Sequence, residues 1–191
     1  MEMPVENVNL RGKLLIAMPG MEDTRFERSV VYICDHNADG AMGLIVNKPT
    51  PELAFERLLE QLSIKSGPHC DQTEIYFGGP VEVGRGFVLH STDYHLQDMT
   101  LRVDEGFAMT ATRDVLIDIA HGTGPQSALL ALGYSGWGAG QLEWELAQNG
   151  WLSCDATPEV VFHTANADKW AAALKLLGVD ALMLSASAGH A

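Results

Sequence analysis

The stretch RGKLLIAMPGMEDTRFERSVVYICDHNADGAMGLIVNKPT, which runs from Arg11 to Thr50, decides the fold of this sequence. Its first apolar run, Lys13–Ala17, ends at a Pro-Gly pair, so we predict a short strand there. Ser29–His36 is rich in β-branched and aromatic residues, which predicts a strand that is buried on both faces. An Asn-Ala-Asp-Gly turn then returns the chain as a further strand, Ala41–Asn47. The stretch therefore predicts one strand followed by a β-hairpin.

Apolar residues at helical spacing predict four helices in the rest of the chain. In the first, residues 51–62, Thr50 is the expected N-cap and Pro51 the first helical residue. The others cover residues 113–121, 141–148 and 166–178, with Asn166 as the cap of the last and Gly178 at its end. Strands are predicted at residues 74–77, 86–90, 100–103, 106–112, 126–135, 151–154 and 159–163. The 126–135 run is also compatible with a helix. Residues 136–140 are predicted as a loop and 180–185 as a strand or an extended tail.

The order of these elements predicts the fold class. Strands follow one another in runs more often than they alternate with helices, which favours an α+β fold with a mixed, strongly bent sheet. We find no internal repeat and no linker rich in Pro, Gly or charge. We therefore expect a single domain over residues 1–191, with residues 1–10 as a loosely ordered leader.

Composition indicates a soluble cytoplasmic protein. Hydrophobic residues make up 47% of the 191, enough for a sizeable core, and no run reaches the roughly 18 apolar residues of a membrane span. The N-terminal residues contain an early acid and no apolar segment, so we do not predict a secretory signal. Three widely spaced cysteines argue against a disulfide framework and fit a reducing compartment.

The formal net charge of −13 disfavours direct binding to nucleic acid, because phosphate backbones repel an acidic protein that lacks a basic patch. One local concentration of positive charge exists, formed by Arg11, Lys13, Arg25, Arg28 and Lys48. These residues either meet an anion or are solvated loop charges.

The glycine-rich segment of residues 133–145, GYSGWGAGQLEWE, does not match the known phosphate-binding loops. A dinucleotide fingerprint requires a third glycine at position 141, which is Gln, and the sequence contains no Walker pattern. Ser135 is not in a nucleophile elbow either, since Trp137 stands where the second glycine belongs. The simpler interpretation is that the glycines let Trp137 and Trp144 pack around a tight loop.

No pair of ligands has the spacing of a metal site, so we predict neither a metal nor a cofactor. Cys34 and His36 are two residues apart on a strand and are therefore expected on one face. Cys34 is either a small core residue or, if the pair is exposed, a reactive thiol that His36 activates. Glu143 and Glu145 do not share a helix face, which argues against a carboxylate dyad.

Two further segments leave alternatives open. Gly78-Gly79-Pro80 follows a strand and either offers backbone N–H groups to an anion or makes a plain tight turn. Met18–Met21 and Phe26 form either an adaptable apolar lip or part of the core.

Taken together, several segments resemble the bacterial AlgH/YqgE family. They are GKLLIAMPGMED, SVVYICDH, GAMGLIVNKP, YFGGPV, RGFVLH, LGYSGWGAGQLEWE and a closing Gly-His pair, and the match runs in order from about residue 8 to residue 190. The resemblance implies a single-domain α+β fold with a branched, partly barrel-like sheet flanked by helices. The family is labelled as transcriptional regulators through its association with exopolysaccharide production, and its genes often lie near that of a Holliday-junction resolvase-like protein. It implies no catalytic residues.

The matching positions imply a candidate binding surface. It comprises Met18, Pro19, Asp23, Phe26, Ser29, His36, Gly43, Asn47, Pro49, Gly78, Gly79, Pro80, Gly133, Tyr134, Gly136, Trp137, Gly140, Gln141 and Glu143. We predict that the N-terminal loop and the GYSGWG segment lie close together and form one cleft.

The sequence leaves three hypotheses for function. The first is a non-enzymatic regulatory or binding protein that acts at this cleft through protein contacts or a small anionic ligand. The second is a regulator that binds DNA directly, which the net charge opposes. The third is an unrecognised enzyme or redox-responsive protein that uses Cys34 and His36.

Overall fold

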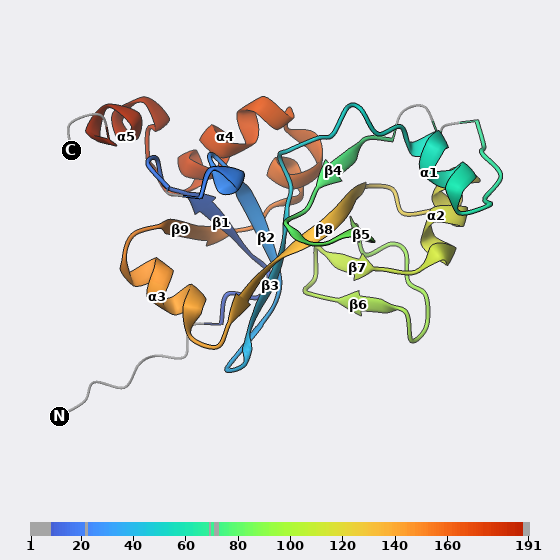
Figure 1. Cartoon of the computed structure of the whole chain (residues 1–191), viewed down its shortest axis with the longest axis horizontal. Helices are drawn as coiled ribbons and strands as arrows, with labels where there is room; N and C mark the ends of the chain where they lie inside the picture. The colour runs from blue at the N-terminus through green and yellow to red at the C-terminus, as the bar shows by residue number, and fades with distance from the viewer. Residues whose placement is uncertain (1–8, 22, 69, 71–72, 189–191) are drawn as a thin grey trace.

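A single bent β-sheet runs through this computed structural model, which describes residues 9–21, 23–68, 70 and 73–188 (Figure 1). The strands are β1 (Lys13–Ala17), β2 (Val30–Asn37), β3 (Gly40–Ile45), β4 (Ile75–Phe77), β5 (Val81–His90), β6 (Thr100–Arg102), β7 (Ala108–Thr110), β8 (Ala128–Gly138) and β9 (Trp151–Asp155). Their order in the sheet is β6-β7-β5-β8-β3-β2-β1-β9. β4 lies off this path and pairs in parallel with β8, while the other strand pairs are antiparallel.

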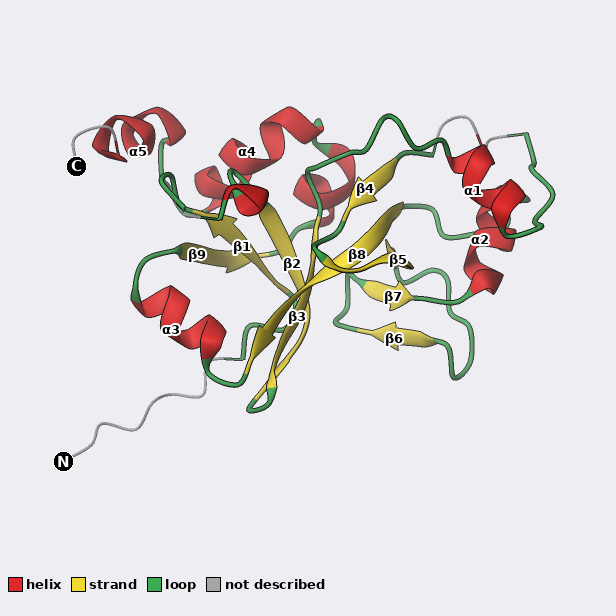
Figure 2. Ribbon diagram, viewed as in Figure 1, coloured by secondary structure: helices red, strands yellow, loops and turns green. Residues whose placement is uncertain are grey.

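The sheet curls into a half-barrel, and helices cover it (Figure 2). The α-helices are α1 (Phe55–Gln61), α2 (Arg113–Ala120), α3 (Gln141–Ala147), α4 (Lys169–Leu176) and α5 (Ala181–Ala188). Short 3-10 helices lie at Thr24–Phe26 (η1) and Asn166–Asp168 (η4), and a π-helix lies at Glu159–His163 (η3). The structure is thus a mixed α+β single domain, as the sequence predicted. No described helix has the length and apolar character that a membrane span requires.

The central strands are buried on both faces, which confirms the prediction made for Ser29–His36. In β1, Leu14 and Ile16 belong to the core beneath α4, whereas Leu15 and Ala17 belong to the core beneath α3. β2 alternates in the same way because successive side chains of a strand point to opposite faces. A third cluster forms where α1 and α2 pack together at the far end of the molecule from α3 (Figure 1).

The predicted strand at Lys13–Ala17 and the hairpin after it are confirmed, the hairpin by the antiparallel pairing of β2 with β3. The predicted leader needs correction at its end. Leu10 is buried, and its N–H donates to Nδ1 of His36 at 3.0 Å. Residues 1–8 of that leader and the closing Gly-His pair fall outside the described residues.

The first predicted helix begins later than expected. α1 starts at Phe55, and Thr50 does not cap it. Instead the N–H and the hydroxyl of Thr50 both donate to the carbonyl of Ile75, at 2.7 and 2.9 Å. The capping group is therefore used to hold the chain against β4.

Two strands are longer than predicted. β5 begins at Val81 and not at Gly86, and β8 continues to Gly138, so the predicted loop 136–140 is wrong in its first three residues. The reason is tertiary, because Ser135–Gly138 pairs with Gly40–Gly43 of the hairpin.

Two segments near the end of the chain are helical, although the first was predicted as a strand and the second as a strand or an extended tail. Glu159–His163 forms the π-helix η3, which buries Val160 and Val161 without a strand partner, and residues 181–188 form α5. Asn166 does not cap α4 either. It opens η4, and its side chain binds the hydroxyl of Tyr76 and the carboxylate of Glu74.

Candidate functional site

A cavity of about 970 Å³ lies between the N-terminal loop and the last residues of β8. Its wall comprises Met18, Pro19, Gly20, Met21, Asp23, Arg25, Phe26, Pro80, Val81, Gly136, Trp137, Gln141, Trp144, Glu145, Gln148, Asn149, Gly150 and Trp151. The predicted convergence of the N-terminal loop with the GYSGWG segment is therefore confirmed. We call this space the tryptophan cavity.

Aromatic side chains form much of its wall. The rings of Trp137 and Trp151 meet edge to face with their centroids 6.0 Å apart, and Phe26 meets Trp151 in the same way at 5.8 Å. Such T-shaped pairs are favourable because the positive edge of one ring faces the negative face of the other. Trp144 differs from these two tryptophans because it is 64% exposed. The cavity thus has a fixed aromatic floor and a solvent-exposed aromatic rim.

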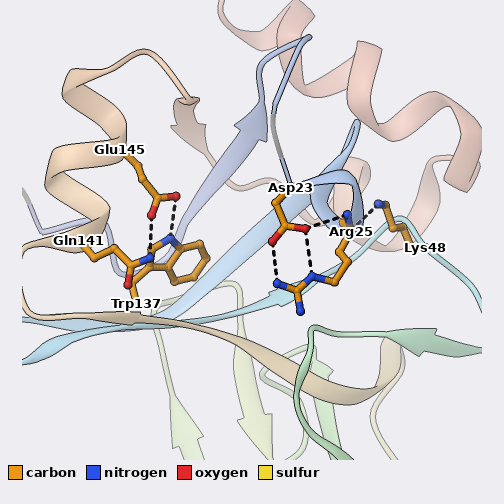
Figure 3. Close-up of polar contacts among 6 residues, drawn as sticks. All are labelled: Asp23, Arg25, Lys48, Trp137, Gln141 and Glu145. Atoms are coloured by element: carbon orange, nitrogen blue, oxygen red, sulfur yellow. Dashed lines mark hydrogen bonds and ion pairs between the residues drawn. The ribbon is translucent and has the colours of Figure 1, made fainter.

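The carboxylate of Glu145 fixes this floor. Its Oε1 accepts the indole N–H of Trp137 at 3.4 Å, and its Oε2 accepts from the amide of Gln141 at 3.0 Å (Figure 3). Oε1 also accepts the indole N–H of Trp151 at 3.0 Å. Gln141 and Glu145 can share the carboxylate because residues four apart lie on one face of α3. Gly140 is the N-cap residue that precedes this helix, and its φ of 74° is a left-handed conformation that glycine adopts without strain.

The opposite wall carries an ion pair. Arg25 donates from Nε and Nη2 to the two carboxylate oxygens of Asp23 at 3.0 and 2.7 Å, and this hydrogen bonding holds the pKa of Asp23 below its usual value (Figure 3). The side chain of Asp23 also accepts the backbone N–H of Arg25, and Asp23 is thereby the N-cap of η1. Lys48 donates to the carbonyl of Arg25 at 2.7 Å. Each charged side chain of this loop that reaches the cavity therefore already has a partner.

The candidate residues divide into those that line the tryptophan cavity and those that do not. Met18, Pro19, Asp23, Phe26, Gly136, Trp137 and Gln141 line it. Pro80 lines it as well. The candidates that lie outside its wall are His36, Glu143, Ser29, Asn47, Gly78, Gly79, Tyr134, Gly43, Pro49, Gly133 and Gly140.

His36 and Glu143 bind one another beneath α3. Nδ1 of His36 accepts the N–H of Leu10, so Nε2 carries the proton that it donates to Glu143. The pKa of Glu143 is lowered by its own backbone N–H and by His36. This pair joins α3 to β2 and to the entering chain, which is a structural role.

Gly78 and Gly79 pack against β8 and do not form an anion nest. The N–H of Gly78 donates to the carbonyl of Leu132 at 2.8 Å. A Cβ at Gly79 would lie 2.1 Å from the carbonyl carbon of Tyr134, so only glycine permits this approach. The tight-turn alternative is therefore the better interpretation.

Three further candidates, Ser29, Tyr134 and Asn47, occupy other parts of the fold. Ser29 is fully buried, and its hydroxyl has no hydrogen-bond partner among the described residues. Tyr134 lines a neighbouring hollow, which shares Val81, Gly136 and Trp137 with the tryptophan cavity, and its ring meets Phe87 edge to face. Asn47 lines a third hollow, together with Arg28 and Lys48. These three residues therefore do not contribute to the wall of the tryptophan cavity.

The structure does not support a reactive Cys34. A shift in register between Ile33 and Asp35 makes Cys34 the extra residue of a bulge. Cys34 remains in the core beneath α4, on the face of Val30 and Tyr32. The bulge turns His36 to the other face, where it contacts Leu10 in the core beneath α3. The predicted shared face is wrong, and complete burial raises the pKa of the Cys34 thiol to about 12.

Comparison with known proteins agrees with this fold. The sequence pattern described as AlgH-like matches residues 14–182. The chain belongs to the AlgH-like family. A UPF0301 protein of Ruegeria pomeroyi is 60% identical to it over 96% of this chain and 100% of the relative. A UPF0301 protein of Paracoccus denitrificans is 55% identical over 97% and 99% of the two chains.

Solved structures share the fold of this AlgH-like chain. The solution structure of the AlgH protein from Pseudomonas aeruginosa is 43% identical, covers 100% of both chains and has a TM-score of 0.78. The crystal structure of protein DIP2367 from Corynebacterium diphtheriae has a TM-score of 0.71 at 22% identity, over 93% of this chain and 90% of the other. The second likeness concerns the fold alone.

Sequence reasoning missed several residues that line the cavity of this AlgH-like chain. Glu145 could have been found, because its spacing of four from Gln141 places both on one helix face. Trp151 carried no such signal, since only the pairing of β9 with β1 brings it beside Trp137. Among the described residues, no cluster of His, Cys, Asp and Glu has the composition to hold a metal ion.

Proposed function

We propose that this AlgH-like chain is a binding protein, and that its tryptophan cavity receives a large apolar side chain from a partner protein. The observation that carries the proposal is the combination of a rigid aromatic floor with the exposed Trp144 at the rim. Exposed tryptophan beside a preformed apolar recess is typical of the residues that dominate protein–protein binding energy. The regulatory role that the family resemblance implies would then act through this contact.

Binding fits the cavity better than catalysis does. Its charged side chains are Asp23, Arg25 and Glu145. Asp23 and Arg25 neutralise one another, and Glu145 accepts three N–H groups of the wall. A general acid, base or nucleophile must be free to exchange a proton or attack a substrate. These groups instead fix the shape of the recess.

An apolar partner also fits the cavity better than an anion does. The cavity wall holds two carboxylates and one guanidinium, and that guanidinium is already paired. Met18 and Met21 supply flexible thioether side chains, which adapt to differently shaped apolar groups. The cavity volume is sufficient for one or two large side chains.

Selection from a random peptide library tests the proposal. Peptides selected on the native chain should contain large apolar residues, and Trp144→Ala should weaken their binding at least about tenfold, or roughly 1.4 kcal/mol. Met99→Ala is the matched control, because Met99 is also exposed but does not line the cavity. Failure to select any peptide, or equal affinities for the Trp144→Ala and Met99→Ala variants, would refute the proposal.

A further inference from the structure

A second hollow, of about 300 Å³, borders the other end of the same N-terminal segment. Its wall includes Arg28 and Lys48, with Glu27 as the one carboxylate, so its charge balance is the reverse of that in the tryptophan cavity. In a chain with a net charge of −13, a hollow with an excess of cations stands out. We call it the Arg28 hollow.

The guanidinium of Arg28 is held in place, and no described residue gives it an anionic partner. It lies over the ring of Trp170 at 4.8 Å from the centroid. Trp170 is itself fixed, because it is buried and its indole N–H donates to the carbonyl of Ala17 at 2.9 Å. Among the described residues, no carboxylate forms an ion pair with Arg28. Stacking on an aromatic ring leaves the N–H groups at the edge of the guanidinium free to bind an oxyanion bidentately.

The backbone of Arg28 is held in a costly conformation. Its φ of 53° is left-handed, which a residue with a Cβ adopts at an energetic penalty. Asn47 enforces this conformation, since its Nδ2 donates to the carbonyl of Arg28 at 2.8 Å and its Oδ1 accepts the N–H of Val30 at 2.9 Å. Strained residues that the surrounding structure holds in place are common at ligand-binding sites. The contacts with Asn47 therefore fix the position of the Arg28 Cα, from which the side chain extends to Trp170.

Lys48 supplies a second positive charge. Its ammonium donates one hydrogen bond to the carbonyl of Arg25 and retains two further N–H donors. The amide of Asn166 and the apolar side chains of Ala167 and Ala171 complete this side of the wall. The hollow thus combines two cationic donors with an apolar surface.

We propose that the Arg28 hollow binds the oxyanion group of a small organic ligand, a phosphate or a carboxylate, between Arg28 and Lys48. The apolar body of the ligand lies against Ala167 and Ala171. This site is separate from the tryptophan cavity, so the proposal is independent of the function proposed above. It also gives a binding role to Arg28 and Lys48, two of the five clustered basic residues noted in the sequence.

Titration of the ¹⁵N-labelled native chain by NMR tests this proposal. The probes are phenyl phosphate and benzoate at constant ionic strength, with benzyl alcohol as a probe of the same body without the charge. We expect saturable shifts in the amides of residues 27–30, 47–48 and 166–171 with at least one of the two anions and not with benzyl alcohol. Which anion binds distinguishes a phosphate site from a carboxylate site.

Variants identify the residue responsible. Arg28→Gln should weaken anion binding at least about tenfold, whereas Arg57→Gln, an exposed arginine on α1, should leave it unchanged. The spectrum of each variant reports whether it remains folded. Absence of saturable shifts with both anions would overturn the proposal. Equal binding by the folded Arg28→Gln variant, or equal shifts with benzyl alcohol, would overturn it as well.

Discussion

The ammonium of Lys48 donates a hydrogen bond to the main-chain carbonyl of Arg25 at 2.7 Å (Figure 3). Lys48 lines the Arg28 hollow and Arg25 lines the tryptophan cavity, so this one contact joins the walls of the two sites. Arg25 belongs to η1, the short helix Thr24–Phe26, and none of the residues of this helix is buried. Its position therefore depends on contacts such as this one.

Lys48→Met should loosen that segment. Loss of one hydrogen bond from a charged donor is expected to destabilise the fold by about 1.5–3 kcal/mol. Amides of residues 24–27 should exchange faster with deuterium, as measured by mass spectrometry of the native chain. Lys65→Met is the control, because Lys65 is exposed and remote in sequence from both sites. Unchanged exchange at residues 24–27 would show that Lys48 does not hold η1.

Glu145→Ala should disturb the aromatic floor. The substitution removes the acceptor of two indole N–H groups, and buried donors left without a partner cost about 1–3 kcal/mol. Urea denaturation followed by tryptophan fluorescence should show that loss, together with a red shift of the native emission. Glu145→Gln keeps one acceptor oxygen and should be milder. A loss no larger than that of Glu60→Ala, an exposed glutamate on α1, would contradict this role.

The three cysteine thiols should be protected from modification in the native protein. Cys34, Cys70 and Cys154 are all buried, and burial raises the pKa of Cys34 to about 12 and that of Cys154 to about 11. Since the thiolate is the nucleophile, Ellman's reagent at pH 8 should react only after unfolding in guanidinium chloride. Rapid reaction of one thiol per native chain would revive the hypothesis of a reactive cysteine.

Lys169 should make stability depend on pH in the alkaline range. Its side chain is 2% exposed, donates to the carbonyl of Val46 at 2.8 Å and lies over the ring of Tyr76. Burial lowers its pKa to about 8 from an ordinary 10.5, despite the opposing charge of Glu74. Between these values the unfolded chain binds more protons than the native chain, so stability rises with pH.

The Lys169→Met variant isolates this effect. Relative to the variant, the native sequence should gain stability between pH 8 and pH 10.5, by an amount on the order of 3 kcal/mol. Urea denaturation of both proteins at pH 7 and pH 10 measures how the difference between their free energies of unfolding changes with pH. Parallel pH profiles of the two proteins would show that Lys169 does not titrate differently in the folded state.

Local sequence patterns predicted the secondary structure correctly where that structure depends on residues that are close along the chain. The strand at Lys13–Ala17, the hairpin and the inward face of α2 all follow from side-chain periodicity and turn residues. Glu159–His163 is the contrary case. Its apolar composition suits a strand, but no strand edge among the described residues pairs with it, and a helical turn buries the same valines.

The candidate site shows the same division. Met18, Phe26 and Trp137 were predicted to line one cleft, and they line one cavity. The contacts of Phe26 and Trp137 with Trp151 require β9 to pair with β1. The bulge in β2 separated Cys34 from His36, although their spacing in sequence predicted a shared face. A single inserted residue reverses the direction of a side chain, and such a bulge leaves no periodic signal.

The sequence by itself determined the α+β class, the central hairpin and the burial of its strands on both faces, because these depend on the chemistry of residues that are close along the chain. Only the tertiary structure decided that β8 extends through the glycines, that Glu145 joins two tryptophans, and that Arg28 stacks on Trp170. Each of these contacts joins distant elements. Their formation depends on how the whole sheet curls and on which helices cover it, which no local pattern encodes.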